Sequence, residues 1–191
     1  MIKRALALVL FALTTVPSNA QEPPKNSPSD AAHRYFGDTE LVDQNGQKVR
    51  FYTDLLKDRT VIVNVFFTEC SGACPLMSRT FAAIQEEVGD RLGKDVLLIS
   101  ISVDPKNDTP EKLTAYAQRF KARPGWIFLT GSDENVALAL KKLGQTVQDR
   151  NDHSNLFFIG NVRTGLWKKA FGLAPPQEVL KIIKSVLDDR G

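Results

Sequence analysis

The stretch "VIVNVFFTECSGACPLMS", residues 61–78, contains both cysteines of the 191-residue chain. Residues 61–67 are β-branched or aromatic apart from Asn64, which predicts a strand buried on both faces of a sheet. From Pro75 to about Leu92, apolar residues recur at roughly helical spacing. The stretch therefore predicts a buried strand, a short loop that carries two thiols, and a helix that begins close to the second cysteine.

The chain on both sides of this stretch alternates between predicted strands and helices. Before it, Asn45-Gly46 separates two extended runs within residues 39–52, which is a strong short-range signal for a β-hairpin. After it, Thr109 and Pro110 open a helix as N-cap and first helical residue, and Gly144 closes another. The further predicted strands are residues 96–103, residues 126–130, "LFFIG" and "LWKKAFG", and the further helices are residues 110–120, 132–143 and 175–189.

This order of elements predicts an α/β fold. Strands that alternate with helices favour a parallel sheet with right-handed crossovers, and the last hairpin adds antiparallel strands at one edge. With a cysteine pair after the first buried strand, the layout is thioredoxin-like: a central mixed sheet flanked by helices, with an N-terminal β-hairpin extension. Functional groups of such sheets gather beyond the carboxyl ends of the strands, and Cys70 and Cys74 lie at that rim.

The N-terminus has the features of an export signal. Lys3 and Arg4 precede the apolar run "ALALVLFALTTV", and "SNA" at 18–20 is a small-x-small cleavage site. Residues 1–20 are therefore predicted to be a signal peptide, with Gln21 as the mature N-terminus and the periplasm as the destination. The alternative is an uncleaved N-terminal anchor, although the apolar run is shorter than the ~20 residues that a membrane span needs.

Residues 21–34, which begin with "QEPPKNSPSD", are predicted to be a flexible leader, and residues 35–191 the folded domain, with no stable membrane span after cleavage. The hydrophobic share of 42% and the charged share of 25% are typical of one globular domain. The signal holds two of the 25 basic residues and none of the 22 acidic ones, so the mature chain is close to neutral. We find no basic stripe, which argues against nucleic acid as a partner.

The cysteine spacing allows more than one chemistry. Cys70 and Cys74 are four residues apart, whereas thioredoxin-type oxidoreductases use Cys-x-x-Cys. If the helix begins between them, their Cα atoms lie roughly 6 Å apart, which permits a disulfide and also lets both thiolates point at one ion. The helix N-terminus is expected to lower the pKa of Cys74. A purely structural disulfide is the third possibility, but so short a loop would add little stability.

A third ligand would have to come from one of the two histidines. His33, in "AAHRYF", lies at the domain edge and is expected to be a surface or packing residue. His153, in "NDHSN", directly precedes the strand "LFFIG", in a loop that faces the cysteine loop in thioredoxin-like folds. Two sulfurs and one nitrogen suit copper in either oxidation state, and also zinc. A loop histidine with its hydrogen bonds satisfied locally is the alternative.

The segments "CSGACP", "SVDPKNDTP" and "DHS", in this order, resemble the motifs of the Sco (SenC) family of copper proteins, and the likeness extends from about Gly37 to the end of the chain. The resemblance implies that Cys70, Cys74 and His153 bind one copper ion per chain, as Cu(I) or Cu(II). It also implies a role in maturing the binuclear copper centre of cytochrome c oxidase. The implied partner is the copper-accepting subunit of the oxidase or another copper chaperone.

Two aspartates match the acidic segment of the family. Asp104 and Asp108 are equally well explained by helix capping and turn chemistry, so we expect them at most to support the ligands. The chain also departs from the family in two respects. Many members are held at a membrane by a helix or a lipid, whereas this chain is predicted to be released by cleavage of its signal peptide. The segment 144–153 is also shorter here and lacks the tyrosine-rich stretch that is common in that loop.

Two functions from different classes fit these residues. The first is a periplasmic metallochaperone that delivers copper to an oxidase subunit, or reduces the cysteines of that subunit. The second is a general periplasmic thiol–disulfide oxidoreductase that cycles Cys70 and Cys74 between dithiol and disulfide. The first function needs His153 and the second does not. A thiol peroxidase fits less well, because the chain has no resolving cysteine beyond the pair.

Overall fold

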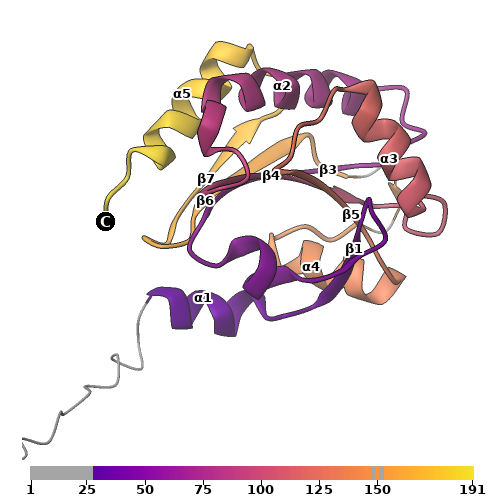
Figure 1. Ribbon diagram of the computed structural model, residues 1–191, viewed down its shortest axis with the longest axis horizontal. Coiled ribbons are helices and arrows are strands. Elements are labelled where there is room, and N and C mark those ends of the chain that lie inside the picture. The colour runs from indigo at the N-terminus through magenta and orange to yellow at the C-terminus, as the bar shows by residue number, and fades with distance from the viewer. Residues whose placement is uncertain (1–27, 148, 151–152) are drawn as a thin grey trace, which may run out of the picture.

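The computed structural model describes residues 28–147, 149–150 and 153–191, which contain one mixed seven-stranded sheet with helices on both faces (Figure 1). The strand order is β2-β1-β5-β4-β3-β6-β7. The strands are β1 (Glu40–Asp43), β2 (Lys48–Arg50), β3 (Thr60–Phe66), β4 (Val96–Ser102), β5 (Trp126–Thr130), β6 (Leu156–Asn161) and β7 (Leu166–Phe171). The helices are α1 (Pro28–Phe36), the π-helix η1 (Phe51–Leu56), α2 (Ala73–Val88), the 3₁₀ turn η2 (Gly89–Arg91), α3 (Pro110–Arg119), α4 (Asp133–Lys142) and α5 (Pro176–Leu187).

Three parallel strands form the centre of the sheet. β3 pairs with β4, and β4 with β5, in the parallel arrangement that the alternation of strands and helices predicts. The antiparallel strand β6 pairs with the other side of β3, with Val63 opposite Phe158. The carboxyl end of β3 and the start of β6 therefore lie at the same end of the sheet. The loop that follows β3 and the loop that precedes β6 also lie at this end.

Each face of the sheet packs against its own layer of helices (Figure 1). α2, α3 and α5 cover one face, with Phe81 and Leu113 among the buried side chains. α1, η1 and α4 cover the other face, where Phe36 is buried. The strand β3 packs against both helix layers, because Ile62 belongs to the core on the first face and Val63 to the core on the second. The run of hydrophobic residues on both sides of Asn64 reflects this double burial.

The predicted N-terminal hairpin is confirmed and forms an edge of the sheet. β1 pairs with β2 and also, in antiparallel fashion, with β5. Gly46 adopts a φ of +76° in the turn, a conformation that glycine takes without strain. The carboxylate of Asp43 accepts hydrogen bonds from the backbone N–H groups of Asn45 and Gln47, both at 2.8 Å. The predicted pair Asn45-Gly46 therefore forms the turn, and the carboxylate of Asp43 holds it in place.

The second half of the hairpin is shorter than expected. Phe51 and Tyr52 were predicted to continue the extended run, but they begin η1. Both side chains are buried, at 0% and 2% exposure. Successive side chains of a strand point to opposite faces, so a helical turn is the conformation that lets two neighbouring aromatic residues enter the same core.

The folded domain begins earlier than the sequence suggests. Residues 28–34, assigned from their composition to the flexible leader, form most of α1. Phe36 at its end is buried, and the hydroxyl of Tyr52 donates to the carbonyl of Ser29 at 2.8 Å. His33 stacks on the ring of Tyr52 at 4.6 Å, which agrees with a surface and packing role. Because proline and serine are as common at helix N-termini as in linkers, composition could not separate the two.

The other predicted helices and strands are confirmed, with ends shifted by a few residues. Thr109 caps α3 by accepting from the N–H of Lys112, and Ser132 caps α4 in the same way from Asn135. The predicted signal peptide and residues 21–27 of the leader lie outside the described residues. Within the part of the chain that the structure describes, no helix combines the length and hydrophobicity that a bilayer span requires.

Candidate metal centre

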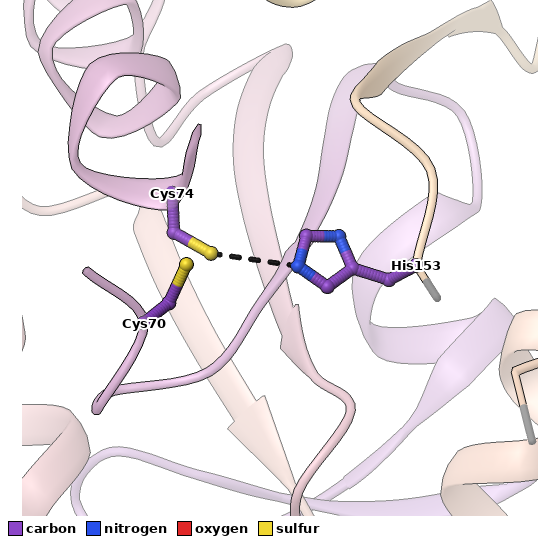
Figure 2. Close-up of side chains that lie close together, drawn as sticks. All are labelled: Cys70, Cys74 and His153. Carbon is purple, nitrogen blue, oxygen red and sulfur yellow. Dashed lines mark hydrogen bonds between the residues drawn. The ribbon is translucent and has the colours of Figure 1, made fainter. Parts of the chain in front are cut away.

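The loop between β3 and α2 carries both cysteines. β3 ends at Phe66, and α2 begins at Ala73, slightly before the predicted start at Pro75. Cys74 therefore lies in the first turn of α2, while Cys70 lies in the loop that leads into it. Figure 2 shows the two sulfur atoms pointing toward each other.

His153 reaches the cysteines from the loop before β6. Its Nε2 atom lies 3.5 Å from Sγ of Cys74, and the two sulfurs and the ring nitrogen all lie within 4.8 Å of one another (Figure 2). The antiparallel pairing of β3 with β6 explains this meeting, because it places both loops at one edge of the sheet. The three residues that the sequence singled out as ligands are thus brought together.

The donor set suits a soft or borderline metal ion. Thiolate and imidazole ligands are preferred by copper and zinc, whereas magnesium and calcium prefer oxygen ligands. Two of the three donor residues, Cys70 and His153, border a hollow of about 350 Å³, which Phe67 and Arg150 also line. A ligand from another molecule would therefore have access to an ion held by the three residues.

Comparison with known proteins identifies the family of this chain. The SCO1/SenC family model matches residues 27–188. The chain belongs to this family. A Stutzerimonas stutzeri protein named "Putative copper-binding protein" is 35% identical to it, over 75% of this chain and 70% of that protein. The resemblance of the three motifs to the Sco family is thereby confirmed.

Two solved structures of the Sco family share the fold. One is a SCO1/SenC family lipoprotein from Bacillus anthracis, with 26% identity, a TM-score of 0.66, and coverage of 78% of this chain and 92% of that one. The other is BsSco, described as a member of the Sco family of cytochrome c oxidase assembly proteins with a disulfide switch. It has 27% identity, a TM-score of 0.63, and coverage of 77% and 90%. The thioredoxin-like fold is confirmed.

In this Sco-family protein, Asp108 holds the cysteine loop against the sheet. Its carboxylate is 1% exposed and accepts hydrogen bonds from the N–H of Thr68, at 3.1 Å, and from the hydroxyl of the same residue. It also accepts from the hydroxyl of Ser102 at the end of β4. Asp108 therefore connects the loop to the neighbouring strand and lies outside the group of candidate ligand atoms.

Asp104 acts on the loop that carries His153. Its carboxylate pairs with Arg150 at 2.5 Å, and Arg150 also lies 3.7 Å from Glu69 of the cysteine loop. The guanidinium group lies over the ring of Phe67 at 5.1 Å, and Phe67 meets the ring of His153 edge-on at 5.9 Å. These contacts join the two loops that supply the ligands.

Arg150 is the residue that sequence reasoning missed. It lines the same hollow as Cys70 and His153, but its ion-pair partners are far away in the sequence. The only signal available from the sequence is an arginine close to His153 in a short loop. Such a residue is ordinary in a loop, and only the folded chain shows that it bridges Asp104 and Glu69.

Burial controls the protonation of Cys74. Loss of solvent raises the pKa of this thiol to about 12, and the hydrogen bond with Cys70 adds to the rise. Backbone hydrogen bonds, including one at Phe67, lower the pKa but do not outweigh burial. The expectation that the helix N-terminus would lower the pKa of Cys74 is therefore wrong for the metal-free protein. A metal ion must displace the thiol proton to bind there.

The imidazole of His153 needs no such displacement. Burial lowers its pKa, and a hydrogen bond to the carbonyl of Ser154 only partly opposes this effect. The ring is therefore neutral at pH 7, which is the form that binds metal ions. With its proton on Nδ1, where the Ser154 carbonyl lies at 3.4 Å, the ring presents the free electron pair of Nε2 to the cysteines.

Proposed function

We propose that this protein is an exported metallochaperone that binds one copper ion through Cys70, Cys74 and His153 and supplies it during assembly of the copper centre of cytochrome c oxidase. The observation that carries the proposal is the convergence of two thiols and a neutral imidazole within 4.8 Å. The name of the Stutzerimonas stutzeri relative supports copper as the ion. The description of BsSco supports oxidase assembly as the context, and the lipoprotein from Bacillus anthracis supports export.

Copper is the cargo in this proposal, and each ligand has a distinct part in holding it. The thiolates of Cys70 and Cys74 are the soft donors that Cu(I) prefers, and both thiols lose their protons on binding. His153 adds the nitrogen donor that Cu(II) requires. Cys70 is partly exposed whereas Cys74 is buried, so a partner reaches the ion from the side of Cys70.

Anaerobic titration of the reduced protein with Cu(I) against a competing chelator tests this function. The protein should bind one Cu(I) per chain. Cys70→Ser or Cys74→Ser should lower the affinity by about a hundredfold or more, roughly 3 kcal/mol, because a single thiolate leaves the ion to the chelator. Ser71→Ala, an exposed position in the same loop, is the matched control and should bind like the wild type. Full affinity in either cysteine variant would contradict the shared site.

A thiol–disulfide oxidoreductase is the second candidate function, and the placement of the cysteines favours it. Both are free thiols, and their sulfur atoms point toward each other within 4.8 Å, so a small movement brings the pair to disulfide distance. A disulfide would remove both thiolates, so oxidation and copper binding exclude each other. The two functions differ in their need for His153, which a dithiol–disulfide cycle does not use.

A further inference from the structure

The loop that carries Cys70 separates two hollows on the surface. One is the hollow beside His153. The other, of about 580 Å³, lies between the first turns of α2 and the end of α3, and we call it the arginine groove. The loop contributes residues 68–72, including Glu69, and the two helices contribute Pro75, Leu76, Arg79 and Arg119. Cys70 lines both hollows, so it is the ligand that a molecule in the arginine groove would touch.

The two arginines of the groove differ from the other cations near the site. Lys112 and Arg150 both pair with Glu69, at 3.4 and 3.7 Å. Arg79 and Arg119 are exposed, and neither forms an ion pair with any residue in the described ranges. Glu69 is the one carboxylate among the lining residues of the groove, and it pairs with Lys112 and Arg150 rather than with Arg79 or Arg119. The two guanidinium groups therefore keep their charge in one concave surface and produce a positive potential beside Cys70.

The groove also offers an apolar contact. Leu76 is 50% exposed and lies about one helical turn before Arg79 on α2. A single exposed leucine is ordinary on a protein surface. Together with a partly exposed thiol and two arginines that form no ion pair within the described residues, however, it gives the composition that protein–protein interfaces favour, in which arginine is enriched.

We propose that the arginine groove docks an acidic segment of the protein that receives copper. The inference rests on the proposed metallochaperone function and names the chemistry of its partner. With the segment in the groove, the acceptor's thiols approach the ion from the side of Cys70. The exchange is redox-neutral: copper stays Cu(I), each acceptor thiol releases its proton on binding the ion, and Cys70 and Cys74 take up protons as they release it.

Charge complementarity of this kind acts mainly on the rate of encounter. Opposite potentials steer two molecules together, and like charges slow their approach. Dissolved salt screens these forces beyond a Debye length of about 10 Å at 0.1 M ionic strength. Transfer to an acidic acceptor should therefore be fast at low salt and should slow as salt is added.

Two synthetic peptides test the proposal. Both carry the same pair of cysteines as a Cu(I) acceptor, but one is flanked by glutamates and the other by lysines. Copper transfer from the Cu(I)-loaded protein is followed anaerobically by stopped flow. At low salt the glutamate peptide should accept copper about tenfold faster than the lysine peptide, and the difference should shrink at high salt.

Charge-reversed variants assign the effect to the groove. Arg79→Glu with Arg119→Glu should abolish the preference for the glutamate peptide. Lys94→Glu with Arg163→Glu changes the net charge equally, but both positions lie at the opposite end of the sheet, beside the start of β4 and between β6 and β7. This matched control should keep the preference. Arg79→Gln with Arg119→Gln removes the two positive charges without adding carboxylates. This variant should show a preference for the glutamate peptide that lies between those of the wild type and the charge-reversed variant.

The outcomes separate this inference from the proposed function. Equal transfer rates to both peptides, or an equal loss of preference in both charge-reversed variants, would overturn the docking proposal while leaving copper binding intact. Failure of the wild-type protein to load Cu(I) would instead overturn the metallochaperone function. Cu(I) loading of each variant is measured first, which distinguishes a docking defect from a lost copper site.

Discussion

His153 is the residue that distinguishes copper chemistry from thiol chemistry in this protein. Two thiolates are sufficient for Cu(I), whereas Cu(II) prefers nitrogen and oxygen donors in a tetragonal field. Within the described residues, the group of candidate ligands contains one nitrogen donor, His153, and its ring is held neutral by burial. Its loss should therefore affect Cu(II) far more than Cu(I).

We expect His153→Ala to lose the thiolate-to-Cu(II) charge-transfer absorption while keeping a measurable, weaker affinity for Cu(I). The Cys70–Cys74 disulfide should still form in air and be reduced normally, because no step of that cycle uses the imidazole. Absorption spectra, chelator competition and mass spectrometry of the thiols measure the three properties.

His33→Ala is the matched control, since His33 is the other histidine and contacts Tyr52, far from the cysteine loop in the sequence. It should keep the Cu(II) spectrum of the wild type. If His153→Ala keeps that spectrum as well, His153 is no ligand, and the thiol–disulfide oxidoreductase becomes the better account of the protein.

At the scale of single residues, the sequence was sufficient to predict the ligands but not their protonation. Cys70, Cys74 and His153 could be chosen because the chain has two cysteines and two histidines and because motifs surround them. The pKa of Cys74 depends on how deeply the folded chain buries the thiol, which no local pattern records. Spacing suggested a lowered pKa, and tertiary packing reversed the sign.

At the scale of elements, the β3–α2 loop depends on a carboxylate that belongs to another part of the chain. Asp108 accepts three hydrogen bonds, two from Thr68 and one from Ser102. Replacement of Asp108 by an apolar residue would leave buried hydrogen-bond donors without an acceptor. The free-energy penalty of an unsatisfied buried donor is larger than the net stabilisation that one hydrogen bond provides. The cysteine loop would also lose its attachment to β4.

We expect Asp108→Ala to lower the free energy of unfolding by about 3 kcal/mol, because Thr68 and Ser102 keep donors that nothing else accepts. Chemical denaturation of the metal-free, reduced protein measures the change. Asp90→Ala, at an exposed position of η2, should change stability by less than about 0.5 kcal/mol. Equal stability of the two variants would show that Asp108 does not hold the loop.

Elements with strong local signals were predicted well. The buried runs of β3 and β4, the Asn45-Gly46 turn and the Thr109 cap each carry their own signal in the sequence. α1 and η1 were missed because both are short and depend on tertiary contacts. The packing of Phe36 and Tyr52 into the core is what makes these segments helical, and composition does not show it.

At the scale of the whole molecule, the sheet is what makes a three-ligand site. Cys70 and Cys74 are neighbours in any conformation of the chain, whereas His153 lies 79 residues beyond Cys74 and meets it only when β3 pairs with β6. An unfolded, reduced chain therefore keeps a two-thiolate site for Cu(I) and loses the third donor. Copper stabilises the fold only by the difference in its affinity for the folded and unfolded chains.

Copper loading should therefore raise the Tm of the reduced protein, and His153 should account for much of the rise. If the folded chain holds Cu(I) about a hundredfold more tightly than the unfolded chain, the gain is about 2.7 kcal/mol, or roughly 5 to 10 °C in a domain of this size. In His153→Ala the folded and unfolded states offer nearly the same pair of thiolates, so the Tm shift should largely disappear although Cu(I) still binds.

Two control variants bracket this result. Cys70→Ser with Cys74→Ser should show no Tm shift on addition of Cu(I), and His33→Ala should show the full wild-type shift. Calorimetry under anaerobic conditions measures all four proteins. An undiminished shift in His153→Ala would mean that the fold stabilises the two-thiolate site without the imidazole.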